Sequence, residues 1–184
     1  MTIWFAADHH FQHAKILTFT DENGKRLRPE FENIQDHDNH IIAQHNSRVK
    51  DDDIVYFLGD VTWKTNEVAR EILAALRGRK RLVVGNHDDV DFLMSTGAFE
   101  RTYLWKYFPE HNLIASHVPL AERDLKRAKF NVHGHLHEKA VTHVSHNENS
   151  IADTITDLRY LNVSMERTKY KPYSLEQIQT MFIE

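Results

Sequence analysis

The stretch Ile54-Val55-Tyr56-Phe57-Leu58-Gly59-Asp60 does most to decide the fold of this 184-residue chain. Its first five residues are a continuous β-prone apolar run, typical of a strand that is buried on both faces of a sheet. The run stops at a glycine and an aspartate. We therefore expect a central strand of an α/β sheet, with a carboxylate placed at its carboxyl end.

Four other short apolar runs stop at His, Asp or Asn in the same way. They are Thr2 to Ala6 before Asp8-His9-His10, Arg81 to Val84 before Gly85-Asn86-His87-Asp88, Asn112 to Ala115 before His117, and Phe130 to His133 before Gly134-His135-Leu136-His137. In open α/β sheets the functional crevice lies beyond the carboxyl ends of the strands, so groups that follow separate strands converge there.

The segments between these runs predict helices first and further strands later. Helices are expected within Glu32 to Val49, after a cap at Thr65 or Asn66, over Asp91 to Met94, and at a capping box formed by Ser174 and Gln177. A strand is expected over Arg101 to Tyr107 and an edge strand over Tyr160 to Glu166, while the polar segment Glu138 to Ser150 is expected to be a mobile loop. This order favours an α/β sandwich whose sheet is parallel at first and antiparallel later.

The composition limits the kinds of partner and metal site that this chain can have. The length and a hydrophobic content of 41% fit a single domain over residues 1–184. The formal net charge of -4 argues against stable binding of long duplex DNA. The absence of cysteine excludes disulfides and thiolate metal sites, whereas 14 histidines are far more than packing requires. No basic and apolar segment precedes the first expected strand at Thr2, and no apolar run reaches membrane-spanning length. We therefore expect no leader peptide and a cytoplasmic location.

The residues at the strand ends are oxygen and nitrogen donors suited to Mn, Fe, Ni or Zn. The converging candidates are Asp8, His10, Asp60, Asn86, His117, His135 and His137. Seven donors are too many for one ion. If one carboxylate bridges, they divide into two sets of four, as two neighbouring metal ions require.

In their order, Asp8-x-His10, Gly59-Asp60, Gly85-Asn86-His87-Asp88, His117 and Gly134-His135-x-His137 resemble the five motifs of the calcineurin-like metallophosphoesterase superfamily. The run Asp8 to His13 is similar to the extended first motif of its short bacterial and phage-type members. The resemblance implies a four-layer α/β/β/α sandwich of mixed sheets, with Asp8, His10 and His137 on one metal, Asn86, His117 and His135 on the other, and Asp60 between them. Manganese is the metal we expect, with Fe, Ni or Zn as alternatives.

The resemblance also implies a mechanism. A hydroxide that bridges the two metals would attack phosphorus, and His87, which is not a ligand, would protonate or steady the leaving oxygen. Two dications and two aspartates leave the site with a positive surplus that attracts phosphate. The chain departs from the family pattern at Trp63, where many members have a second Asp that orients the catalytic His. Trp63 is therefore expected to line the substrate pocket.

The other histidines have plainer expected roles. His9 and His133 are expected to support the site or to pack, His13 to contact substrate or to fix the first loop, and His37, His40, His45 and His111 to be solvated.

The sequence favours a phosphodiesterase acting on a small nucleotide, a cyclic nucleotide or an RNA end, because no arginine pair that could clamp a monoester is evident. A phosphomonoesterase, including a protein phosphatase, is the alternative enzyme. A noncatalytic scaffold on the same fold is a second class, which the presence of all seven ligands and His87 disfavours. The oligomeric state is left open.

Overall fold

Strand β2 (Ile54–Leu58) lies in the middle of a five-stranded sheet of order β11-β1-β2-β3-β4. The other strands are β1 (Ile3–Ala6), β3 (Arg79–Val83), β4 (Phe99–Tyr103) and β11 (Tyr173–Ser174). Strands β1 to β4 are parallel, and the short β11 pairs antiparallel with β1. The computed structural model describes residues 1–146 and 152–182.

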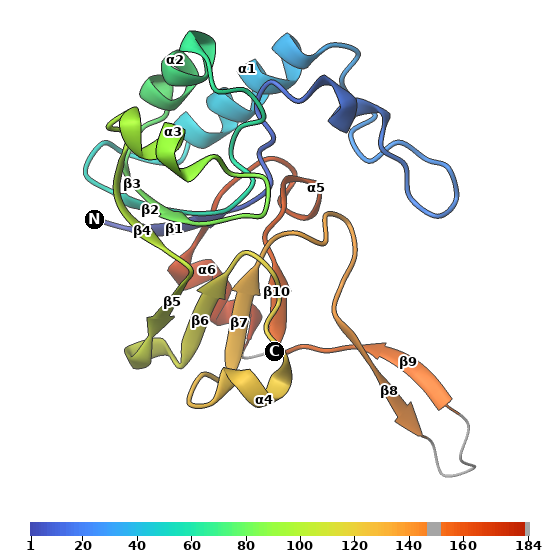
Figure 1. The fold of residues 1–184 in the computed structure, drawn as a ribbon. Helices are drawn as coiled ribbons and strands as arrows, with labels where there is room; N and C mark the ends of the chain where they lie inside the picture. The colour runs from blue at the N-terminus through green and yellow to red at the C-terminus, as the bar shows by residue number, and fades with distance from the viewer. Residues whose placement is uncertain (147–151, 183–184) are drawn as a thin grey trace.

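A second sheet of order β10-β7-β6-β5 faces the first (Figure 1). It consists of β5 (Trp105–Phe108), β6 (Leu113–Ser116), β7 (Phe130–His133) and β10 (Tyr160–Asn162). Strands β6, β7 and β10 are parallel to one another, and β5 is antiparallel to β6. The predicted sandwich of mixed sheets is confirmed.

The alternation of side chains along β2 explains why every residue of this strand is apolar. Ile54, Tyr56 and Leu58 face the second sheet and pack with residues such as Phe108 and Val132. Val55 and Phe57 point the other way, into the core beneath the helices. Both faces of β2 are thus covered, as the sequence predicts.

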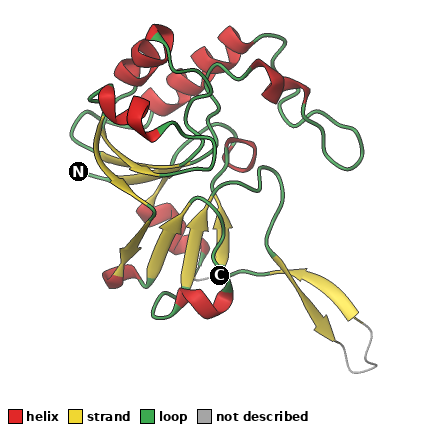
Figure 2. Ribbon diagram, in the orientation of Figure 1, coloured by secondary structure: helices red, strands yellow, loops and turns green. Residues whose placement is uncertain are grey.

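Helices α1 (Ile34–Asn46), α2 (Glu67–Ala75) and α3 (Val90–Ser95) form the layer above the first sheet (Figure 2). Asn66 caps α2, in agreement with one of the two predicted caps. The outer face of the second sheet is covered by the single-turn helix α4 (Glu122–Leu125) and its flanking residues. The remaining helices are α5 (Met165–Thr168), α6 (Leu175–Met181) and two short 3-10 helices, Ala14–Thr18 and Pro109–His111.

The predicted capping box is confirmed at the start of α6. The Ser174 hydroxyl accepts from the Gln177 N–H, and the Gln177 side chain accepts from the Ser174 N–H. Among the described residues, no helix combines the length and the apolar character needed to cross a membrane.

The strand predicted over Arg101 to Tyr107 is wrong as a single element. The chain leaves the first sheet after Tyr103 and enters the second at Trp105, so one β-prone run supplies an edge strand to each sheet. Leu104, at the crossover, is 71% exposed. No glycine or proline marks the crossover, so local propensity could not reveal it.

The loop predicted over Glu138 to Ser150 is wrong at residues 142–146, whereas residues 138–141 form no helix or strand. Strand β8 (Thr142–His146) pairs antiparallel with β9 (Ala152–Thr156), and the hairpin extends away from both sheets (Figure 1). Residues 147–150 of the predicted loop lie outside the described residues. The edge strand expected over Tyr160 to Glu166 ends at Asn162, and the chain then turns into α5.

Candidate metal centre

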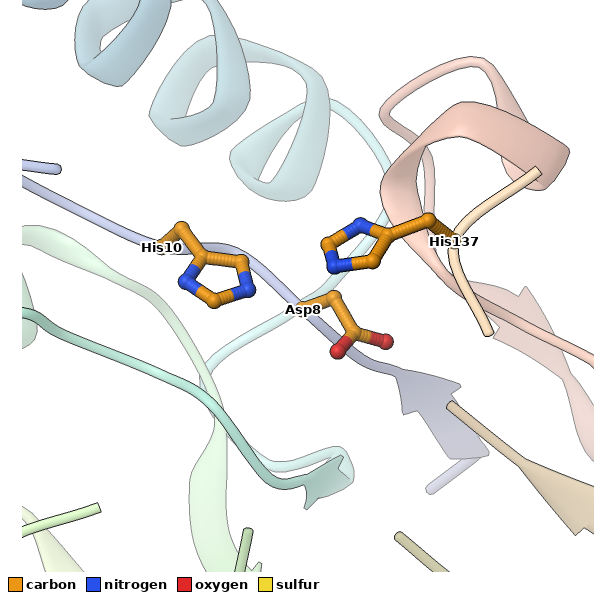
Figure 3. A group of neighbouring side chains, drawn as sticks. All are labelled: Asp8, His10 and His137. Carbon is orange, nitrogen blue, oxygen red and sulfur yellow. The ribbon is translucent and has the colours of Figure 1, made fainter. Parts of the chain in front are cut away.

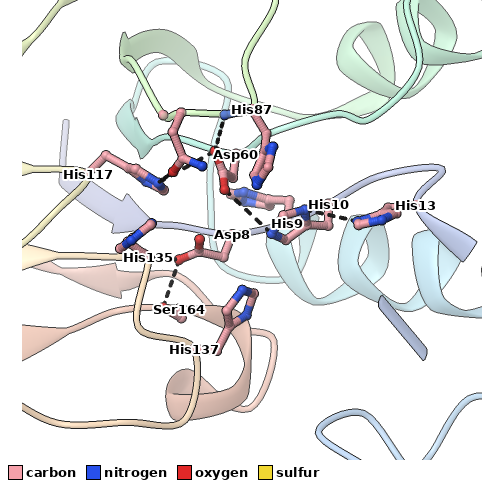
Figure 4. Close-up of polar contacts among 12 residues, drawn as sticks. Asp8, His9, His10, His13, Asp60, His87, His117, His135, His137 and Ser164 are labelled. Carbon is pink, nitrogen blue, oxygen red and sulfur yellow. Dashed lines mark hydrogen bonds and ion pairs between the residues drawn. The ribbon is translucent and has the colours of Figure 1, made fainter. Parts of the chain in front are cut away.

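The residues predicted as metal ligands meet between the carboxyl ends of the two sheets (Figure 4). Asp8 and His10 follow β1, Asp60 follows β2, and Asn86 follows β3. From the second sheet, His117 follows β6, and His135 and His137 follow β7. The centre therefore joins loops that lie as far apart in the sequence as residues 8 and 137.

The first half of the centre consists of Asp8, His10 and His137 (Figure 3). One donor atom from each of these side chains lies within 4.8 Å of the other two. The His10 and His137 rings stack with their centroids 5.3 Å apart. Two imidazoles and a carboxylate that converge in this way are a suitable donor set for a first-row divalent metal.

The second half consists of Asp60, Asn86, His117 and His135. Asp60 and His117 also form a donor group with Asp8 within the same 4.8 Å limit. The Asn86 Oδ1 lies 2.9 Å from His117 Nε2, and the His135 ring meets the His117 ring edge-on at 5.1 Å.

Asp60 faces both halves. Its Oδ2 lies 3.7 Å from His10 Nε2, and its Oδ1 lies 3.5 Å from His117 Nε2. A carboxylate that presents one oxygen to each half is placed as a bridging ligand requires.

The imidazoles of both halves are oriented by contacts at the nitrogen that points away from the centre. His117 Nδ1 lies 2.8 Å from the Leu58 carbonyl, and His137 Nδ1 lies 3.0 Å from Glu166 Oε1. An Nδ1–H that donates to oxygen leaves Nε2 with a free lone pair, which is the usual arrangement of metal-bound histidine. The lone pair of His117 Nε2 then faces Asn86 Oδ1, and a cation between them would satisfy both.

Several buried polar atoms at the centre have no partner among the described residues. They include Asp8 Oδ1 and His10 Nε2. Burial raises the pKa of Asp8 to about 6 and lowers the pKa of His10 well below its usual value. Buried polar atoms without a partner are unfavourable. A metal ion bound here would give these atoms a partner, so the residues present fit a bound metal.

Backbone strain is concentrated at the same residues. Of the ten non-glycine residues with positive φ in the part of the chain that the structure describes, five are candidate ligands, namely Asp8, His10, Asp60, His135 and His137. Left-handed backbone is uncommon for residues with a side chain and gathers at functional sites.

Two glycines allow the strand ends to approach. A Cβ on Gly59, whose φ is +83°, would lie 2.5 Å from His117 Nδ1, and one on Gly134 would lie 2.5 Å from Asp8 Oδ2. The motif glycines therefore leave room for the ligands of the neighbouring strands.

The structure adds supporting residues that the sequence did not reveal. The Ser164 hydroxyl donates to Asp8 Oδ2 at 2.7 Å, and Arg28 donates to the carbonyl of Asp8 at 2.6 Å. Arg28 also binds Glu166 at 2.8 Å, and Glu166 in turn accepts from His137. Burial acts to raise the pKa of Glu166, but Arg28 and His137 outweigh it and hold that pKa at about 2. No strand-end motif contains these residues, so no local signal could have found them.

Two histidines expected to be solvated are buried, and these expectations were wrong. His37 contacts the Arg28 guanidinium through Nε2 and Asp38 through Nδ1. His45 lies beneath Phe57 and bonds the Arg77 carbonyl at 2.9 Å. Both point inward from α1, on the face that packs against the sheet.

Asp88, next to His87 in the sequence, has another role than orienting the His87 ring. Its Oδ2 accepts from the N–H groups of Asp60 and Gly85, and its Oδ1 accepts from that of Val61. Asp88 thus ties the loop after β3 to the loop after β2.

His87 is exposed beside the centre. Its N–H donates to Asp60 Oδ1 at 3.0 Å, and its ring lies 6.2 Å from that of His10 and 5.2 Å from that of Trp63. The His13 ring stacks on Trp63, and its Nδ1 lies 3.3 Å from His10 Nδ1. His9 packs between Phe11 and Phe57, and the buried His133 bonds the Gly134 carbonyl.

A groove with a volume of about 520 Å³ opens beside the first half. It is lined by Thr18, Phe19, Thr20, Leu27, His135, Leu136, His137, Glu138 and Lys139. The groove is larger than a phosphate group needs, so it can hold the organic part of a substrate.

Comparisons with known proteins agree with this geometry. A family model described as calcineurin-like phosphoesterase matches residues 1–175. The uncharacterized protein MJ1445 of Methanocaldococcus jannaschii is 30% identical over 178 residues, which are 96% of this chain and 88% of that protein. The Gene 66 protein of Mycobacterium phage D29 is 27% identical over 89% of this chain and 87% of its own length. The crystal structure of the protein of unknown function AQ665 from Aquifex aeolicus is similar with a TM-score of 0.67, 25% identity and 98% coverage of both chains.

Proposed function

Because the chain belongs to the calcineurin-like phosphoesterase family, we propose that it is a phosphodiesterase with two divalent metal ions. In this proposal Asp8, His10 and His137 hold one ion, Asn86, His117 and His135 hold the other, and Asp60 binds both. When bound, the metals supply a nucleophile at neutral pH and polarise the phosphoryl oxygens. Manganese is the metal we propose.

One observation carries this proposal. Two groups of converging donors, Asp8 with His10 and His137, and Asp8 with Asp60 and His117, lie side by side, and Asp60 presents one oxygen toward each half. A single ion would leave part of this donor set unused, whereas two ions use all of it.

His87 is proposed as the acid for the leaving group. It is exposed, lies beside His10 and Asp60, and its side chain has no hydrogen bond among the described residues. Its backbone N–H, bound to Asp60 Oδ1, fixes the distance between this residue and the proposed bridging carboxylate. The ring is thus free to give a proton to the oxygen that leaves phosphorus.

The surroundings of the centre favour a diester over a monoester. A monoester dianion is usually held by arginine forks. Arg28, the arginine behind the first half, is fully buried and bonds Asp8, His9 and Glu166 instead. A monoanionic diester needs less cationic help, and the groove beside His137 has room for its second organic group.

The test is hydrolysis with added Mn²⁺ of bis(p-nitrophenyl) phosphate compared with p-nitrophenyl phosphate. We expect a higher kcat/KM for the diester, and a strong preference for the monoester would contradict the proposal. His87→Ala should keep its metal content and lose about 10²- to 10⁴-fold in kcat on diesters of ordinary alcohols. His111→Ala, in a half-exposed position remote from the strand ends that carry the centre, is the control. Loss of metal from His87→Ala would instead make His87 a ligand.

A further inference from the structure

Trp63 presents an open aromatic face at the mouth of the candidate centre. It lies on the loop after β2, close behind Asp60, and is 45% exposed. One face of its indole is covered by the His13 ring, which is parallel to it within 5° at a centroid distance of 3.9 Å. Because His13 covers one face, the exposed part of the side chain lies on the other face and the edges of the indole, with the His87 ring beside it.

The position of this indole is set by the backbone around it. The Trp63 N–H donates to the Phe11 carbonyl at 2.9 Å, and Phe11 forms a parallel bridge with Thr62. Phe19 meets the other member of the stack, His13, edge-on at 5.7 Å. Because the aromatic pair is held in place beforehand, a ligand that stacks on Trp63 needs to order little of the protein.

The Trp63 ring adjoins the group proposed to protonate the leaving oxygen. Its centroid is 5.2 Å from that of His87. His13, beneath Trp63, lies on the side of His10 away from Asp8 (Figure 4). A planar group bound on the indole would therefore belong to the alcohol that leaves at His87, and not to the part of the substrate that stays on phosphorus.

We propose that Trp63, backed by His13, is a stacking platform for the nucleobase of the leaving nucleoside, so that the substrates are nucleotidyl phosphodiesters. The inference rests on the proposed function. Nucleobases stack well on indole because every base has a broad π face.

The groove beside the first half has room for the rest of such a substrate. The groove of about 520 Å³ begins at His135 and His137 and is lined further out by Phe19, Leu27 and Lys139. The Lys139 ammonium is exposed and can meet a second phosphate. Phe19, which meets His13 edge-on, also lines the groove, so the groove adjoins the aromatic stack and can hold the part of the molecule that does not stack on Trp63.

The test compares substrates that differ only in one base. The probes are the dinucleotide deoxyadenylyl-deoxyadenosine and two analogues in which one or the other deoxyribose has hydrogen in place of adenine. We expect the parent protein to hydrolyse the dinucleotide about 5- to 150-fold faster, as kcat/KM, than the analogue that lacks the base on its leaving side. Product analysis identifies that side.

The ratio of kcat/KM for the dinucleotide to kcat/KM for the analogue is measured in each variant. A loss of activity that is common to both substrates then cancels. In Trp63→Ala the ratio should fall to near one, and in Trp63→Phe most of it should remain. Trp105→Ala is the matched control, because Trp105 is 56% exposed but lies on the edge strand of the second sheet. An unchanged ratio in Trp63→Ala, or no discrimination by the parent protein, overturns the inference and leaves the proposed function standing.

A binding measurement covers the case in which no diester is hydrolysed, which would overturn the proposed function. In the Mn²⁺-loaded protein, adenosine 5′-monophosphate should quench tryptophan fluorescence and ribose 5-phosphate should not. The quenching should disappear in Trp63→Phe and persist in Trp105→Phe. Equal responses to the two phosphates would overturn the stacking platform by themselves.

Discussion

The two halves of the candidate centre are supported in different ways. Behind the first half, buried charged side chains from distant parts of the sequence, Arg28 and Glu166, hold Asp8 and His137. The second half is held by hydrogen bonds to backbone groups, in which Asp88 ties the loops after β2 and β3 together and the Leu58 carbonyl orients His117.

Ligands that lie side by side can therefore depend on supporting interactions of different strength. Removing one member of a buried ion pair leaves an uncompensated charge, which is strongly destabilising. Removing a carboxylate that only accepts from backbone N–H groups leaves a smaller deficit. Loss of the buried ion pair behind the first half should therefore destabilise the whole fold. Loss of the carboxylate that supports the second half should have a smaller effect on the stability of the fold.

The largest expected effect is that of Arg28→Met. The change leaves Glu166 buried without its cation and removes the donors to the Asp8 and His9 carbonyls. We expect the free energy of unfolding of the metal-free protein to fall by about 3–5 kcal/mol, measured by denaturant titration.

Two further variants sharpen this result. The double variant Arg28→Met with Glu166→Gln should recover part of the loss, because no unpaired charge remains. Arg79→Met breaks the exposed pair with Glu100 and should change stability little, because solvent screens this pair. Equal losses at Arg28 and Arg79 would show that burial of the Arg28–Glu166 pair adds nothing to its effect on stability, which contradicts this prediction.

Asp88→Asn is the corresponding change in the second half. An amide nitrogen must then face at least one of the three N–H groups that Asp88 accepts from, and we expect a loss of about 1–3 kcal/mol by the same titration. The control is Asp89→Asn, because Asp89 caps α3 and asparagine caps equally well. If Asp88→Asn lost as much as Arg28→Met, the two halves would not differ in their support.

Glu166→Gln tests how far the first half depends on its support for metal binding. The amide cannot accept from His137 as strongly as the carboxylate does, so the affinity for the first metal should fall by about 10- to 100-fold. Isothermal titration with Mn²⁺ would measure this, with the exposed Glu176→Gln as control. A loss confined to the second metal would reverse our assignment of the halves.

The smallest expected effect is the dependence of metal binding on pH. Burial raises the pKa of Asp8 to about 6, so a metal ion must displace a proton from this carboxyl below that pH. Affinity for the first metal should then fall by about tenfold for each pH unit below 6.

The stability of the metal-free protein depends on pH in the opposite direction. Between the ordinary aspartate pKa of 3.8 and the raised pKa of about 6, the folded state still binds a proton at Asp8 that the unfolded chain has lost. The stability that this group contributes therefore decreases as pH rises through that range. Equal affinities for Mn²⁺ in titrations at pH 5 and pH 7.5 would contradict the predicted dependence of metal binding on pH.

The sequence predicts the second half better than the first. Gly59, Gly85 and Asp88 belong to the same short motifs as the ligands Asp60 and Asn86, although the groups that they accommodate or hold follow other strands. Arg28, Ser164 and Glu166 lie outside every strand-end motif and act on Asp8 and His137 from 20 to 156 residues away, and no pattern of apolar spacing encodes such contacts. The strands and helices follow the same rule. β2 and the α6 capping box could be predicted because their signals are local, whereas the passage between sheets at Leu104 could not, because it depends on tertiary packing.

The β8–β9 hairpin has a consequence for how this chain can change in length. Val144 and Ile155 on it are exposed, and neither belongs to the hydrophobic clusters that hold the sheets and helices together. Residues can therefore be gained or lost there without disturbing the packing of the sandwich. Yet the strand on one side follows the loop of His137, and the strand on the other leads through β10 to Ser164 and Glu166. The hairpin is thus the segment in which relatives of different length are expected to diverge while the centre beside it stays the same.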